Sequence, residues 1–162
     1  MSVLFVFLLL VACVQCKAPD GYTVNVADGY AYKLMYVAQP WDDAREQCLA
    51  DGAKLAVPQS PEQFAFMQEI VHKMHFPSVV GSEYKHLVWL GIDSQKGNVW
   101  KNLDGVDINQ TGYHKWATGN GKIFSSDDRE PHCVGLDSTN EGLRDFWCKH
   151  KQPYLCEVKT TA

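Results

Sequence analysis

The sequence predicts an α+β domain with two helices early in the chain, short strands late in the chain, and two ends that meet. Three observations predict this fold class: helical patterns between residues 41 and 74, strand-like segments on either side of them, and four cysteines after an apolar leader. The first of these cysteines is Cys48, whereas the other three lie in the last thirty residues. Disulfides between such distant positions require the fold to bring the end of the domain back to its first helix.

The first sixteen residues are expected to be a secretory signal peptide. An apolar core runs from Val3 to Val14 without a charged side chain, and small residues precede a cleavage point before Lys17. A competing interpretation takes Leu10–Cys13 as a bacterial lipid-attachment box, but no basic residue precedes the apolar core. We therefore expect a secreted, extracellular protein.

The rest of the chain is expected to form one domain. About 145 residues are enough for one hydrophobic core, and no linker or repeat divides them. We assign residues 17–29 to a short N-terminal extension and residues 30–159 to the domain. The formal charge of −4 is spread over both signs, which favours solubility over a nucleic-acid partner or membrane insertion.

The cysteines that remain after the leader predict two disulfides. Removing the leader takes Cys13 and Cys16 away and leaves an even set of four in an oxidising compartment. A four-cysteine zinc site would need short paired spacings, and the chain has no Cys-x-x-Cys pair. The spacing alone leaves three connectivities open.

The first elements are a strand or hairpin and a helix. Tyr and Val alternate with small or polar residues over Tyr22–Val37, which is typical of strands. The segment Trp41–Ala50 places Trp41, Ala44 and Cys48 on one helical face, and acidic residues stand in its first turn.

A second helix has a clear beginning. Ser60 is a suitable N-cap, Pro61 suits the first turn, and Gln63 completes a capping box. Its buried stripe is predicted to be Phe64, Met67, Ile70, Val71 and Met74.

The second half of the chain predicts short strands around a long irregular region. Leu87–Ile92 is strand-like, and so are Cys133–Leu136 and Pro153–Val158. Residues 93–130 have almost no long apolar period, which is typical of a functional loop region.

Taken in order, these segments resemble the C-type lectin-like domain family over Tyr30–Val158. The resemblance implies that family's fold, with two helices, short antiparallel sheets, a long loop region and two disulfides. It also implies the pairing Cys48–Cys156 and Cys133–Cys148. The residues that carry it are Trp41 to Cys48, Ala53-Lys54-Leu55-Ala56, Trp89-Leu90-Gly91-Ile92, Trp100, Asp104-Gly105, Tyr113, Trp116, Cys133, Cys148 and Cys156-Glu157.

Sugar-binding members of this family hold a calcium ion with carboxylates and amide carbonyls, because Ca²⁺ takes six to eight oxygen ligands. At the position of the family's loop tripeptide this chain has Asn120-Gly121-Lys122, which lacks the acid and the proline. At the position of Trp-Asn-Asp it has Leu143-Arg144-Asp145, so only Asp145 matches. Glu130 matches in part, one residue too far from Cys133.

Calcium is therefore a possible cofactor with a degenerate site, and no cofactor is certain. Glu130 and Asp145 are weak metal candidates, and Asp127 and Asp128 are alternative oxygen donors in a lengthened segment. The candidate ligand-binding residues are Asn120, Lys122, Glu130, Arg144 and Asp145.

Three cations near this loop suggest a different chemistry. Lys122, Arg129 and Arg144 would supply a fixed positive field in place of the ion and favour anionic glycans. The simpler interpretation makes Arg144 a surface residue that forms a salt bridge with Asp145.

Two further features bear on function. Asn109-Gln110-Thr111 is an N-glycosylation sequon in a polar turn, and the alternative is an asparagine that only shapes that turn. Three tryptophans fall at core positions of the family and are expected to be buried: Trp89, Trp100 and Trp116. The resemblance makes no prediction about the burial of Trp41 and Trp147.

The sequence thus predicts a secreted protein that recognises extracellular glycans on microbes or cells, similar to the single-domain humoral lectins of invertebrate immunity. The alternative is a calcium-independent module of the same fold that binds a protein surface, as in venom or adhesion proteins. No constellation of serine, histidine or paired carboxylates predicts catalysis.

Overall fold

The computed structural model describes residues 17–82, 84, 86–95, 99–122, 127 and 129–161. The predicted signal peptide, with the alternative lipid-attachment cysteine, lies outside the described residues. The first described residues already belong to the folded body, because Lys17 pairs with Thr161 in an isolated bridge. Part of the segment predicted as an N-terminal extension also forms the first strand.

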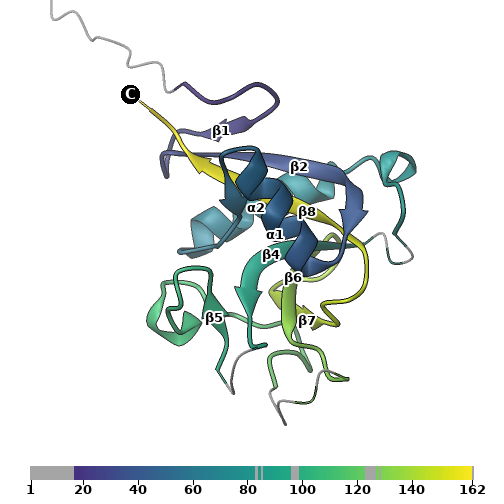
Figure 1. Cartoon of the computed structure of the whole chain (residues 1–162). Helices are drawn as coiled ribbons and strands as arrows, with labels where there is room; N and C mark the ends of the chain where they lie inside the picture. Colours follow the sequence, from purple (N-terminus) through teal and green to yellow (C-terminus); the bar gives the residue numbers. More distant parts are fainter. Residues whose placement is uncertain are drawn as a thin grey trace, which may run out of the picture.

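The described residues form one mixed sheet of eight strands (Figure 1). β1, β2, β8, β4, β6 and β7 follow one another in this order, while β3 pairs with β8 and β5 pairs with β4. All pairs are antiparallel except β4 and β8, which run parallel at Trp89 and Tyr154. The strands are β1 (Thr23–Asn25), β2 (Tyr30–Gln39), β3 (Lys54–Leu55), β4 (Leu87–Asp93), β5 (Lys101–Asn102), β6 (Cys133–Asp137), β7 (Leu143–Phe146) and β8 (Gln152–Lys159).

The two α-helices are those that the sequence predicts. Helix α1 spans Trp41–Ala50 and α2 spans Pro61–His72, and two short 3-10 turns follow at η1 (Phe76–Ser78) and η2 (Ile108–Gln110). The side chain of Ser60 accepts a hydrogen bond from the Gln63 N–H at 3.0 Å, as the capping box requires. The returning bond differs, because Gln63 Oε1 accepts from the N–H of Gln59.

Strand β4 is buried on both faces, which explains its uninterrupted apolar sequence. Val88, Leu90 and Ile92 belong to the cluster that also holds the buried residues of α2, whereas Leu87 and Trp89 belong to the cluster of α1. Because side chains alternate along a strand, the two helices cover opposite faces of the sheet at β4.

Two buried indole groups fix the position of α1. Trp41 Nε1 donates to the carbonyl oxygen of Leu90 at 2.7 Å, and Trp89 Nε1 donates to that of Gln39 at 3.0 Å. A buried indole N–H needs such an acceptor, so both tryptophans pack without leaving a polar group unpaired.

The disulfides have the pairing that the family resemblance implies. Cys48–Cys156 joins α1 to β8, and Cys133–Cys148 joins β6 to the turn after β7. The first closes a sequence separation of 108 residues and the second a separation of 15. The end of the domain therefore returns to its first helix, and the second bond braces the loop region.

Figure 1 shows how this frame presents the loops. The helices lie with β1, β2 and β8 in one half of the molecule, while β5, the ends of β6 and β7, and the long connections lie in the other. Residues between β4 and β6 contribute only β5 and η2 as regular elements among the described residues. The prediction of a long irregular region there is confirmed.

Candidate functional site

The loop that contains Asn120 and Lys122 lies against β7. Trp116 pairs with Leu143 in an isolated parallel bridge. The N–H of Ala117 donates to the carbonyl of Leu143, and the N–H of Leu143 donates to that of Lys115, both at 2.9 Å. The backbone therefore holds the beginning of this loop beside the beginning of β7.

Two hydrogen bonds then close the loop over Asp145. The carboxylate Oδ2 of Asp145 accepts from the N–H of Gly121 at 3.0 Å. In return, the N–H of Asp145 donates to Oδ1 of Asn120 at 3.2 Å. The structure thus brings together Asn120 and Asp145, two of the predicted site residues, and they bind the protein itself.

Gly121 is the residue that permits this closure. Its φ is +82°, and a Cβ atom on it would lie 2.4 Å from the ring of Trp116. Its carbonyl oxygen accepts from Trp100 Nε1 at 2.9 Å. The loop is therefore packed on the pair Trp100 and Trp116, whose ring centroids are 4.9 Å apart.

The carboxylate of Asp145 is only partly accessible. Burial raises the pKa of Asp145, although the hydrogen bond from Gly121 and the nearby Arg144 act in the opposite direction. A carboxylate with this environment is a poorer ligand for a divalent cation than a solvated one, since one of its oxygens already has a donor.

Arg144 does not form the predicted salt bridge with Asp145. Its guanidinium forms an ion pair with Asp137 on β6 instead. Adjacent residues of a strand point to opposite faces, so Arg144 and Asp145 lie on different sides of β7. Register places Gly135 opposite Arg144, which puts Asp137 on the same face as the guanidinium.

Asp137 is held by more than one donor. It is 2% exposed and accepts from both the N–H and the hydroxyl of Thr139 at 2.6 Å. Burial alone would raise the pKa of Asp137, but the hydrogen bonds from Thr139 and Arg144 outweigh it and lower the pKa to about 2. This ion pair is therefore a fixed part of the loop face.

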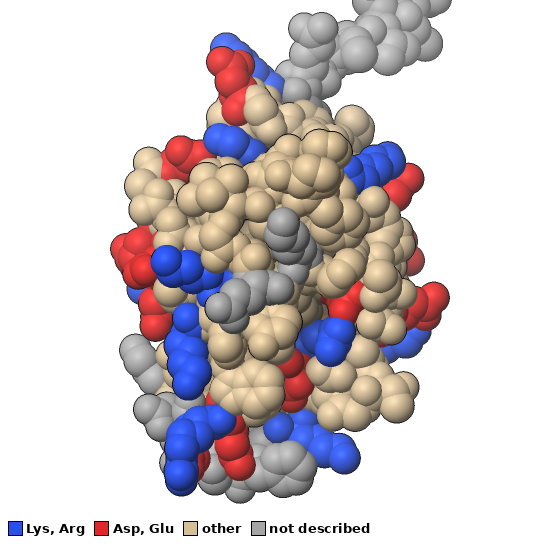
Figure 2. Space-filling view, turned by 90° about the vertical axis from the view of Figure 1, so that its right-hand side faces the viewer, with Lys and Arg blue, Asp and Glu red and all other residues tan. Residues whose placement is uncertain are grey.

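The three predicted cations do not form a common positive field. Arg144 is neutralised by Asp137, and the guanidinium of Arg129 forms an ion pair with Asp127 at 2.5 Å. Lys122 is exposed and has no ion pair with a described residue. Figure 2 shows one face of the molecule on which basic and acidic side chains are interspersed and most of the surface carries neither.

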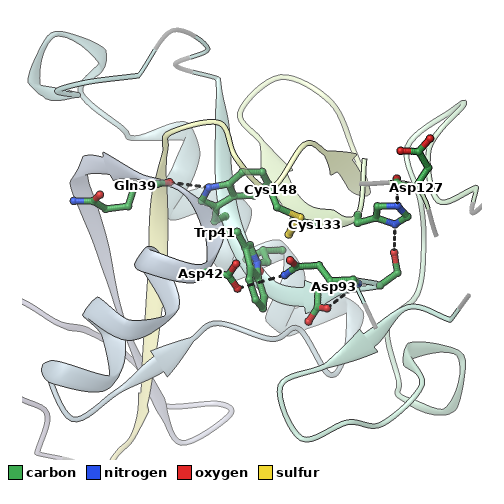
Figure 3. The surroundings of a disulfide bond; sticks show 12 residues. Gln39, Trp41, Asp42, Asp93, Asp127, Cys133 and Cys148 are labelled. Carbon is green, nitrogen blue, oxygen red and sulfur yellow. Dashed lines mark hydrogen bonds between the residues drawn. A yellow bond between two sulfur atoms is a disulfide. The ribbon is translucent and has the colours of Figure 1, made fainter. Parts of the chain in front are cut away.

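The segment before Cys133 is anchored by a buried histidine. The N–H of Ser94 donates to the carbonyl oxygen of His132 at 2.8 Å. The hydroxyl oxygen of Ser94 also lies 2.8 Å from Nδ1 of His132. Nε2 lies 2.8 Å from the carbonyl oxygen of Asp127, which can only accept, so Nε2 carries the proton and Ser94 donates to Nδ1. Figure 3 shows the adjacent disulfide with Trp41 and Asp127 drawn on either side of it.

Serine and histidine can act as a nucleophile and its base, but Ser94 and His132 are not accessible to a substrate. Ser94 is 2% exposed and His132 5% exposed, and the third group is a main-chain carbonyl in place of a carboxylate. The pair therefore serves to position the loop.

The described residues do not fit a calcium ion at the family's position. Asp145 is used by Gly121, Asp127 by Arg129, and no cluster of three or more His, Cys, Asp or Glu side chains suited to a metal occurs among them. Glu130 is half-buried beside Asp127, whose carbonyl accepts its N–H at 2.9 Å. Asp128 lies outside the described residues.

A polar pocket of about 460 Å³ opens beside the closed loop. Of the predicted ligand-binding residues it includes Asn120 and Arg144. Trp116, which the sequence predicts to be fully buried, is half-buried and is one of the residues that line the pocket. The lining residues are Lys115, Trp116, Ala117, Thr118, Asn120, Asn140, Glu141 and Arg144.

Five of these lining residues are missed by the sequence interpretation: Lys115, Ala117, Thr118, Asn140 and Glu141. Lys115 and Glu141 form an exposed ion pair at 3.2 Å across the pocket, and Asn140 is exposed beside them. The Asx-rich turn Asp137–Gly142 before β7 is the signal that points to Asn140 and Glu141.

None of the helices in the described part of the chain has the length and apolar character needed to cross a membrane.

The chain matches proteins of known class along most of its length. The sequence model described as "Lectin C-type domain" matches residues 37–158. The hemolymph lipopolysaccharide-binding protein of Periplaneta americana is 26% identical over 142 residues, which are 87% of this chain and 53% of that protein. Asialoglycoprotein receptor 1 of Rattus norvegicus is 26% identical over 138 residues, which are 82% of this chain and 42% of the receptor.

The chain thus spans about half the length of these two relatives. Among solved structures, a calcium-independent type II antifreeze protein superposes with a TM-score of 0.70 at 19% identity, covering 90% of this chain and 97% of its own. The carbohydrate-recognition domain of the mouse scavenger receptor C-type lectin also gives 0.70, at 18% identity and with 90% and 98% covered. These structures confirm the fold, and the sequence match over residues 37–158 shows that the chain belongs to the family of C-type lectin domains.

Proposed function

We propose that this chain is a secreted carbohydrate-recognition protein whose loop-face pocket binds glycans of microbes or cell surfaces. The loop-face pocket is the cavity lined by Lys115, Trp116, Asn120, Glu141, Arg144 and their neighbours. The names of two relatives, a lipopolysaccharide-binding protein and an asialoglycoprotein receptor, support a glycan as the ligand. Calcium at the family's usual position is not required for this binding.

One observation carries the proposal: two hydrogen bonds hold the loop against Asp145 beside a polar pocket. One runs from the Gly121 N–H to the Asp145 carboxylate, and the other from the Asp145 N–H to the Asn120 side chain. In sugar-binding members of the family, carboxylates and amide carbonyls at these positions hold a calcium ion. In this chain, the hydrogen bonds that Asp145 forms with Gly121 and Asn120 order the loop. The pocket is therefore formed before a ligand arrives, which lowers the entropy cost of binding.

The lining groups suit a sugar ring. Glu141 is an acceptor for hydroxyl groups, Lys115 is a donor, and the amide of Asn140 offers both. The partly exposed ring of Trp116 provides an apolar surface for the C–H face of a sugar. Because the Lys115–Glu141 pair is exposed, its groups exchange partners with hydroxyls at little cost.

A glycan array run in EDTA tests the proposal. The wild-type chain is expected to bind a defined set of glycans, and the double variant K115A/E141A is expected to lose about tenfold in affinity for them. The control variant E69A/K73A removes an equally exposed ion pair from α2 and is expected to bind as the wild type does. If the wild type and both double variants bind the glycans equally well, the sugar does not bind in this pocket.

Failure to bind any glycan would favour the alternative function, in which this domain binds a protein surface without calcium. The relative named snaclec bitiscetin subunit alpha, of Bitis arietans, is 22% identical over 133 residues, which are 88% of that protein. Its name gives it as a subunit, which supports contact between a module of this family and another protein chain.

Asn109 is proposed to carry an N-linked glycan. Its side chain is exposed on η2, and Nδ2 donates to Asp107 Oδ1 at 2.9 Å. An amide that carries a glycan keeps one N–H, so this contact is compatible with modification. Expression in eukaryotic cells, followed by peptide N-glycosidase, should give a mass shift that N109Q lacks, and sequencing of the secreted chain should begin at Lys17.

A further inference from the structure

A group of four rings packs edge to face near the end of β7. Tyr84 lies 5.4 Å from Phe146 and 5.5 Å from His150, measured between ring centroids. Phe146 also lies 5.4 Å from Trp147. Tyr84 and Trp147 remain 49% and 37% exposed, so the group presents aromatic surface to solvent.

A small pocket of about 230 Å³ opens at this group. It is lined by Gly81, Tyr84, Lys149, His150 and Lys151, and we call it the Tyr84–Lys151 pocket. It is smaller than ordinary small-molecule sites, which start at about 300 Å³. Its size therefore suits one charged group together with part of one ring.

The two lysines of this pocket have no acidic partner among the described residues. Lys149 and Lys151 are exposed, and neither forms an ion pair with a described residue. This distinguishes them from Arg129 and Arg144, whose guanidinium groups are bound to Asp127 and Asp137. Of the three predicted cations, only Lys122 is likewise without an ion pair to a described residue, whereas here two such lysines line the same pocket.

The rim of the pocket is tied to the sheet. The hydroxyl of Ser82 accepts from the N–H of Tyr84 at 3.2 Å and donates to Oε1 of the buried Gln152 at 3.3 Å. On the other side, Trp147 Nε1 donates to the carbonyl of Arg129 at 2.6 Å. These bonds hold Tyr84 and Trp147 in place before any ligand binds.

We propose that the Tyr84–Lys151 pocket binds a sulfate or phosphate ester on a saccharide. Lys149 and Lys151 would donate to the ester oxygens, and the Tyr84 ring would lie against the apolar face of the sugar. Two ammonium groups that form no ion pair with a described residue match an anionic group, and an exposed ring beside them matches a sugar better than a free ion. The site is independent of the loop-face pocket, which lies at the other end of β7.

The test is an NMR titration of the wild-type chain at low ionic strength. The probes are a sulfated heparin tetrasaccharide, glucosamine 6-phosphate, neutral maltotetraose and inorganic sulfate. We expect the two esters to shift the amide signals of residues 149–151, and the neutral sugar to leave them unchanged. Inorganic sulfate is expected to bind at least tenfold more weakly than the tetrasaccharide.

Two pairs of variants make the test specific. K149A/K151A should weaken tetrasaccharide binding by about tenfold, whereas K17A/K159A, which removes two charges about 26 Å away along β8, should change it less than twofold. Y84A should weaken the tetrasaccharide but not inorganic sulfate, and Y84F should behave as the wild type.

The proposal is overturned if K17A/K159A weakens binding as much as K149A/K151A, or if inorganic sulfate binds as tightly as the tetrasaccharide. Absence of shifts at residues 149–151 overturns it as well. K115A/E141A should leave this titration unchanged, so a negative result here is separate from a negative result at the loop-face pocket.

Discussion

At the scale of single residues, the loop face is ordered by protein groups that satisfy one another. Asp145 accepts from Gly121, and Asn120 accepts from Asp145. Arg144 and Asp137 form an ion pair on the opposite side of β7. Each of these contacts can be removed by one substitution, so their contributions are measurable separately.

The Asp145 acceptor is expected to stabilise the closed loop. D145A leaves the half-buried N–H of Gly121 without its partner, which should lower the free energy of unfolding by about 1–2 kcal/mol. D145N keeps an acceptor oxygen and should cost about 0.5 kcal/mol or less. Urea denaturation compares the two, and a D145N variant as unstable as D145A would show that the charge matters and the hydrogen bond does not.

The Arg144–Asp137 pair predicts a particular acid dependence. The folded pKa of Asp137, about 2, is below its ordinary value of 3.8, so its stabilising effect is present above pH 3.8 and is lost as the pH falls towards 2. R144M should lower the free energy of unfolding at neutral pH by about 1–3 kcal/mol and make the loss between pH 4 and pH 2 smaller.

Urea denaturation at several pH values checks this, with R45M as the control because Arg45 forms an exposed pair with Glu46 on α1. An R144M variant with the acid dependence of the wild type would contradict the assignment of Arg144 to Asp137.

At the scale of elements, the pairing of β3 with β8 buries a carboxylate. Glu157 is fully buried and lies 3.6 Å from Lys54 Nζ. Lys54 and Glu157 are cross-strand partners in the register of these strands. Burial raises the pKa of Glu157 to about 7, against the lowering effect of the Lys54 ammonium.

This raised pKa predicts that the protein loses stability as the pH rises. The folded state holds the Glu157 proton up to about pH 7, whereas the unfolded state releases it near 4.5, so stability falls between these values by on the order of 3 kcal/mol. E157Q cannot ionise and should flatten this part of the profile. The exposed control E69Q should not, and a wild-type profile that rises from pH 4.5 to 7 would contradict the prediction.

At the scale of the whole molecule, two disulfides hold the helices and the loop face to one sheet. Cys48–Cys156 spans 108 residues and Cys133–Cys148 spans 15. In the chain-entropy account the longer loop contributes more, because closing it removes more conformations from the unfolded chain.

Removing each pair should reveal this order. C48A/C156A is expected to lower the free energy of unfolding by about 5 kcal/mol and C133A/C148A by about 3 kcal/mol. Urea denaturation without reductant measures both. A greater loss for the shorter loop would mean that local packing near Cys133, and not chain entropy, decides the contribution.

The sequence predicts the helices well and the contacts between strands poorly. Helix α1 follows from the spacing of Trp41, Ala44 and Cys48, which is a local pattern. The partner of Arg144 does not follow, because Asp137 reaches it through the pairing of β6 with β7. Strand β7 itself is missed, since its four residues carry no clear alternation.

The candidate site shows the same division. The family pattern points to Asn120 and Asp145 as candidate site residues, but only the fold shows that they bond across the loop. Lys115 and Glu141 carry no family signal, and they meet only because two distant turns lie side by side.

The affinity for the best ligand of the glycan array, measured by titration calorimetry in EDTA and again in millimolar calcium, tests the central claim most directly. The closed loop predicts the same dissociation constant, within about twofold, in both conditions. Loss of binding in EDTA that calcium restores would contradict it, because Asp145 would then have to release Gly121 and bind the ion.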